Sequence, residues 1–241
     1  MDQLGTRRLL LHAVADPAKV LLLPENVLAF EQDAGVPGDQ LRLWLACHQV
    51  AGQRVLAGVG WLGDHLRRLV DDVAVQTEPD PSGLMDRLQS LDIGRPEALQ
   101  ELLEGGGAQG LLGPPSAALQ AATGRLEVLL ALAAGYALVI CGRALEARLP
   151  ALAAIEAAFG RRAADPQGPF HLFAMLLRVD PERAAAARGE RFCREVLAAT
   201  DIEGLDRLWS HPDFLPTSEE LDVPGRWLER VGLVGGDEVD L

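Results

Sequence analysis

The chain has 241 residues, of which 49% are hydrophobic and only 5% aromatic, and its formal net charge is −13. The core must therefore consist largely of Leu, Ala and Val, which favours helices, because strands are rich in β-branched and aromatic residues. The acidic balance argues against a nucleic-acid partner, since phosphate groups are bound by clustered Lys and Arg. We predict a mainly helical chain with one domain at residues 1–234 and an acidic tail at 235–241.

The N-terminal part is expected to contain the only β structure. Residues 20–23 form a short apolar run before Pro24, which predicts a strand. Residues 26–34 then predict a short helix that ends at Gly35. Asp39 is expected to cap a helical segment over 39–74, which the glycines of 58–60 either bend or interrupt.

A glycine-rich stretch at 104–115 separates this part from the rest of the chain. It lacks the Gly-Lys-Ser/Thr sequence of a phosphate-binding loop, so we interpret it as a connection within the domain. Ser116 is expected to cap a long helix that extends to about Leu149 and is interrupted at Pro150. Its apolar run at 128–142 is shorter than the ~18–20 residues that span a bilayer, which indicates a buried core helix.

The C-terminal part is predicted to be a series of shorter helices. They are expected at 151–160, 169–178, 182–199, 203–209 and 217–231. Thr217 and Glu220 have the spacing of a capping box for the last helix. The apolar stripes within 39–74 need a partner, and we expect them to pack on the long helix over 126–140.

The three cysteines, Cys47, Cys141 and Cys193, are widely separated within apolar helical patterns. Their odd number and the lack of Cys-x-x-Cys spacing argue against a disulfide framework or a zinc ribbon. We expect buried, reduced thiols in a cytoplasmic protein, since the N-terminal residues also lack the pattern of a signal peptide. The Arg-rich and Ala-rich composition is typical of a high-GC bacterial genome.

Three blocks of the sequence carry ordered motifs, among them Leu-Pro-Glu-Asn at 23–26, Trp-Leu-x-Asp-His at 61–65, Leu-Gly-Pro at 112–114 and Gly-Glu-Arg-Phe at 189–192. In this order the blocks at 22–70, 111–139 and 188–231 resemble the largely actinobacterial zincin-like metalloproteases associated with deazaflavin-coenzyme biosynthesis. The resemblance implies a compact, zincin-like helical domain. It also implies a zinc site, whose residues can be compared position by position.

The zinc motif is degenerate. A zincin helix carries His-Glu-x-x-His, in which two His bind zinc and the Glu activates water. His48 matches the first ligand, but Gln49 replaces the Glu and Gly52 replaces the second His. The resemblance also aligns Ala134 with a third ligand, a Glu. One histidine cannot hold catalytic zinc, and a glutamine amide is not a general base, so we expect no metal and no cofactor.

We therefore predict a catalytically inactive homologue that acts as a binding or interaction protein. Loss of the ligands would leave an apolar groove near Gly52 and Ala134, lined by Gly135 and Tyr136, which could take a peptide or a small apolar ligand. A protein partner is expected and a membrane is not; the sequence leaves the oligomeric state open. Two alternatives are an active metal-dependent hydrolase with a relocated site, for example at His48, Asp64 and His65, and a purely structural subunit.

Two further interpretations concern single residues. His48 lies on an apolar helical face, which is typical of a hydrogen-bonded core histidine. In the last block, the aromatic and apolar residues either cover the helical core or form an exposed anchor for a partner; they are Trp209, Phe214, Leu215 and Trp227.

Overall fold

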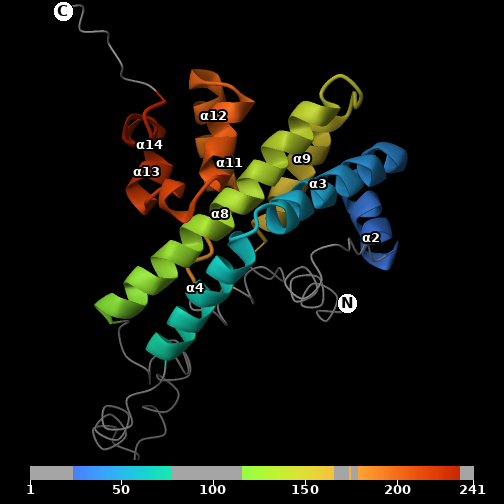
Figure 1. Ribbon diagram of the computed structural model, residues 1–241. Helices are drawn as coiled ribbons and strands as arrows, with labels where there is room; N and C mark the ends of the chain where they lie inside the picture. The colour runs from blue at the N-terminus through green and yellow to red at the C-terminus, as the bar shows by residue number, and fades with distance from the viewer. Residues whose placement is uncertain (1–23, 78–115, 166–173, 175–178, 234–241) are drawn as a thin grey trace, which may run out of the picture.

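The computed structural model describes residues 24–77, 116–165, 174 and 179–233 (Figure 1). Within these ranges every regular element is a helix, as the composition predicted. The predicted strand at 20–23, the connection at 104–115 and the tail at 235–241 lie outside the described residues. So does the predicted helix at 169–178, apart from Ala174.

The centre of the fold is α8, Ala117–Leu145, which runs through the whole molecule in Figure 1. Its N-terminus is capped as predicted, because the Ser116 hydroxyl accepts a hydrogen bond from the Leu119 amide at 3.1 Å. The helix ends four residues earlier than expected, where the amides of Arg148 and Leu149 both donate to the Leu145 carbonyl. Buried side chains lie all around α8, as expected for a core helix covered by several neighbours.

By length and composition α8 could also cross a membrane. In the structure, however, 61% of its most apolar window is buried by other parts of the chain. The core helix of a globular fold passes the same test, so this property of α8 is weak evidence for a membrane span.

Helices α2, Pro24–Ala34, α3, Gly38–Gly58, and α4, Leu62–Thr77, form the N-terminal arm. Gly35 has a φ of 63°, which suits the residue that ends α2. Of the bend or interruption predicted near 58–60, the structure shows an interruption. Val59 is extended, so α3 ends at Gly58 and α4 begins a new axis. Both helices nevertheless pack on α8, as predicted.

The predicted cap at Asp39 was also wrong. Helix α3 begins one residue before Asp39, directly after Pro37, and no side chain caps it. Asp39 lies instead in the first turn, where its negative charge interacts favourably with the helix dipole.

Helices α9, Leu152–Ala163, and α11, Ala186–Ala199, cover other sides of α8. Helix α11 starts later than predicted, because the Asp180 carboxylate binds the amides of Glu182 and Arg183 in a turn. The remaining short elements are α12, Ile202–Asp206, the 3-10 helices Arg207–Trp209 and Pro212–Phe214, α13, Ser218–Asp222, and α14, Pro224–Arg230.

The predicted helix at 217–231 is divided into α13 and α14 at Pro224, which cannot continue a helix interior. The capping box of α13 is confirmed: the Glu220 amide donates to Thr217 Oγ1 at 3.2 Å, and the Thr217 amide donates to Glu220 Oε2 at 2.8 Å.

The aromatic residues of the last block cover the core. Trp227 is fully buried and donates from Nε1 to the Phe214 carbonyl at 2.7 Å, and Trp209 is also buried. Arg230 connects the elements of this block. Its guanidinium pairs with Glu220 and donates hydrogen bonds to the carbonyls of Asp213 and Leu215. Both tryptophans therefore pack in the core and do not form an exposed anchor for a partner.

Candidate functional site

His48 lies in α3 among aromatic side chains. Its ring is stacked on Trp44 from the preceding turn, with centroids 5.0 Å apart and planes 11° from parallel. Phe159 from α9 contacts the same ring at a centroid distance of 5.0 Å. Neither ring nitrogen of His48 has a hydrogen-bond partner among the described residues. His48 thus packs among aromatic rings, and no described residue makes the hydrogen bond that was expected for it.

This environment determines the charge of His48. Burial lowers the pKa of the imidazole from 6.5 to about 4, because the charged form would lose its hydration. His48 is therefore neutral near pH 7. Among the described residues, the interaction that stabilises the ring is therefore aromatic stacking.

The structure brings the other two ligand positions to the interface of α3 with α8. A Cβ added to Gly52 would lie 4.0 Å from the Cβ of Ala137, which is ordinary van der Waals contact. Ala134 precedes Leu138 by one helical turn and so lies on the same face of α8. Leu138 packs in one apolar cluster with Trp44 and other residues of α3. Around Gly52, the interface is therefore formed by carbon atoms of two packed helices.

Gly135 does not line a cleft, contrary to our prediction. A Cβ added to Gly135 would lie 2.1 Å from the Glu190 amide nitrogen of α11. One added to Gly189 would lie 1.9 Å from the Ala131 carbonyl oxygen of α8. The two glycines let the backbones of α8 and α11 meet, so the volume beside Gly135 is already filled.

Tyr136 contacts the C-terminal helices. Its hydroxyl donates to Asp206 Oδ1 at 2.5 Å, and its ring meets the edge of Trp209 at a centroid distance of 5.3 Å. Partial burial, together with the hydrogen bond and the charge of Asp206, raises the pKa of the Tyr136 phenol. The hydroxyl is thus a neutral donor with a fixed partner.

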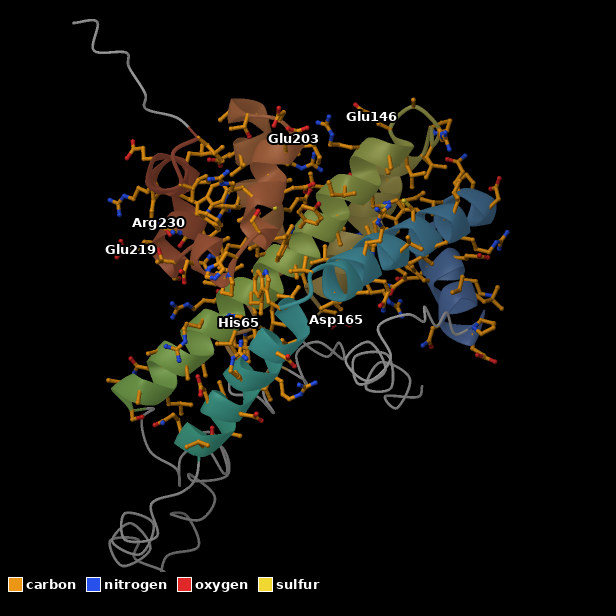
Figure 2. The ribbon with its side chains drawn as sticks, in the orientation of Figure 1. His65, Glu146, Asp165, Glu203, Glu219 and Arg230 are labelled. Carbon is orange, nitrogen blue, oxygen red and sulfur yellow. The ribbon has the colours of Figure 1, made fainter. Side chains whose placement is uncertain are left out.

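The relocated site suggested for His48, Asp64 and His65 does not form. Asp64 pairs instead with Arg67 at 2.7 Å. His65 of α4, labelled in Figure 2, packs edge-on against Trp61, which directly precedes that helix. Burial and then the charges of Arg68 and Arg125 lower the pKa of His65. Its surroundings therefore include two cations, which disfavour a metal ion.

The residues present do not fit a zinc ion. Catalytic zinc takes three protein ligands at about 2.0–2.3 Å in a tetrahedral arrangement. Around His48 the neighbouring groups are aromatic rings and helix carbons. Across the described ranges, no group of three or more His, Cys, Asp or Glu side chains could hold a metal ion.

The sequence of residues 4–228 matches the family model described as zincin-like metallopeptidase. The chain belongs to this family. The match confirms the resemblance at the level of zincin-like proteins, while the link to deazaflavin biosynthesis remains a prediction. No curated protein matches this zincin-like chain.

A solved structure supports the fold. It comes from Chloroflexus aurantiacus and is described as a candidate hydrolase with a novel fold. The two chains share 21% sequence identity with a TM-score of 0.59, and the match covers 87% of this zincin-like chain. It covers 57% of the Chloroflexus chain, so the zincin-like chain spans little more than half of that length.

We did not predict from the sequence that aromatic side chains surround His48. Trp44 could have been found, because a residue four positions earlier lies on the same helical face. Phe159 could not, since no sequence pattern indicates that α9 crosses α3 at this point.

Proposed function

We propose that this zincin-like chain is catalytically inactive and acts as a binding or interaction protein. The observation that supports this most strongly is the environment of His48. The one zinc-ligand type that the motif retains packs against Trp44 and Phe159, which also contact each other, and no group of three metal-binding side chains forms among the described residues. Gln49 also lacks the basicity that activation of water requires.

The outer face of α3 is the surface that we propose for binding. Leu43 and Val50 are each 49% exposed and lie seven residues apart, which places them on one helical face. The opposite face of α3, with Leu41, Trp44 and Leu45, is buried against the rest of the fold. Large side chains exposed in this way at the motif helix are suited to apolar contact with another protein.

The net charge of −13 favours a basic partner, because complementary charge accelerates association and disfavours acidic competitors. We place the protein in the bacterial cytoplasm, with a protein or peptide as its partner. The alternative groove near Gly52 and Gly135 is disfavoured by the filled volume beside Gly135.

The binding role can be tested with tagged full-length protein recovered from cells that express it. We expect a basic partner to be retained by the wild type and lost from the double variant Leu43→Glu, Val50→Glu, because two charges would disrupt apolar contact. Val75→Glu is the matched control, since Val75 is 63% exposed on α4 and lies away from this face.

Equal recovery of the same proteins by all three forms would contradict the assignment of the α3 face. Absence of any stoichiometric partner would favour the remaining alternative, a purely structural subunit.

A further inference from the structure

Two of the three cysteines lie together where α3 packs on α8. Cys141 of α8 is completely buried, and its thiol lies 3.7 Å from the Trp44 carbonyl oxygen of α3. Cys47 follows Trp44 by three residues on the same helix, so its side chain is on the same side of α3. Cys47 packs against the apolar cluster that contains both Cys141 and Trp44.

The two thiols differ in access. Cys47 is partly exposed, whereas Cys141 is buried. The third thiol, Cys193, is buried on α11 within a different apolar cluster from the one that contains Cys141. The structure therefore provides one accessible thiol, one buried partner beside it, and one separate thiol as an internal control.

We propose that Cys47 and Cys141 form a reversible disulfide that links α3 to α8 when a low-molecular-weight disulfide such as oxidised glutathione is present. Disulfides require Cβ atoms about 3.5–4.5 Å apart, and the contact of the Cys141 thiol with the Trp44 carbonyl, one turn from Cys47, brings the two side chains together across the packed helices. This inference does not depend on the proposed binding function, because it concerns only the packing of α3 on α8.

The chemistry is thiol–disulfide exchange in two steps. The Cys47 thiolate attacks one sulfur of oxidised glutathione and forms a mixed disulfide, and the first glutathione leaves and takes up a proton. The Cys141 thiolate then attacks the Cys47 sulfur, and the second glutathione leaves and takes up a proton. Two protein thiols are oxidised, and one external disulfide is reduced to two thiols.

The second step should be slow at neutral pH. Burial raises the pKa of the Cys141 thiol, and the hydrogen bond and charge of Cys47 and the charge of Glu156 on α9 raise it further. Only the thiolate attacks, so the rate of closure should increase as the pH rises.

The test uses the full chain, fully reduced, freed of reductant and then exposed to oxidised glutathione. We expect the wild type to lose two of its three free thiols, and peptide mapping to recover a 47–141 link that dithiothreitol reverses. The oxidised form should have a higher melting temperature than the reduced form, because a cross-link restricts the unfolded chain.

The variants separate the cysteines. Cys193→Ser should lose both of its remaining thiols and form the same link, whereas Cys47→Ser and Cys141→Ser should form no intramolecular link. Circular dichroism of each variant checks that it is folded, and the Cys193→Ser result stands even if another variant unfolds. The proposal is overturned if all three wild-type thiols remain free, if the link involves Cys193, or if only intermolecular disulfides form.

Discussion

His48, which the resemblance aligns with a zinc ligand, packs among aromatic side chains of α3 and α9. Its ring packs against Trp44 and Phe159, which also contact each other, and its nitrogens have no partner among the described residues. A histidine in this position contributes apolar contact area but also carries the cost of two unpaired polar atoms. A ring of similar size without nitrogens should serve the packing better.

We therefore predict that His48→Phe keeps the fold and changes its response to acid. The folded-state pKa of about 4 is below the ordinary value of 6.5, so the unfolded chain binds the proton first as the pH falls. The contribution of His48 to the free energy of unfolding should be fully present above pH 6.5 and should be lost progressively as the pH falls to 4. With a shift of this size the loss is at most about 3–4 kcal/mol.

Urea unfolding at pH 7.5 and pH 4.5 checks this prediction. The variant should lose less stability between the two pH values than the wild type, and at pH 7.5 it should be at least as stable. An identical loss in both proteins would show that His48 is not buried in its neutral form.

At the same scale, two of the helix caps could be predicted from the sequence. Ser116, and Thr217 with Glu220, were predicted as caps and make the expected hydrogen bonds. Asp39 was predicted wrongly, since the turn at Pro37 starts α3 one residue before it. The start of a helix depends both on a possible capping side chain and on the backbone conformation of the residues beside it. The sequence alone does not show which of the two determines the first helical residue.

At the scale of elements, the crossing of α8 and α11 depends on Gly135 and Gly189. The small residues at 134 and 135 were interpreted as the lining of a groove, but the backbone of α11 packs directly against Gly135. This could not be predicted, because α8 is apolar on most sides and its periodicity does not indicate which neighbour covers which face.

We predict that Gly135→Ala destabilises the fold by about 3 kcal/mol, because the added methyl group would overlap the backbone of α11 and force the helices apart. Gly124→Ala is the control in the same helix, where the new methyl group meets no described atom within 4 Å. It should be neutral or stabilising by up to about 1 kcal/mol, since alanine favours a helix over glycine. Thermal and denaturant unfolding of both variants measure the difference, and equal stability would contradict the close crossing.

At the scale of the whole molecule, composition and periodicity predicted the helical fold and the packing of the N-terminal arm on the long helix. The resemblance to zincin-like proteins was confirmed over residues 4–228. The arrangement around His48 depends on contacts between α3 and α9, which are far apart in the sequence. Such contacts follow from packing, not from local pattern.

The central claim is that the zinc-motif helix no longer holds a metal. The most direct test is the zinc content of full-length protein purified without chelator, incubated with excess zinc and then freed of unbound metal, with His48→Phe treated in the same way. We predict far less than one zinc per chain in the wild type, no change in the variant, and no peptide hydrolysis that a chelator abolishes. One zinc per wild-type chain that is lost in His48→Phe, together with chelator-sensitive peptide hydrolysis, would contradict this account.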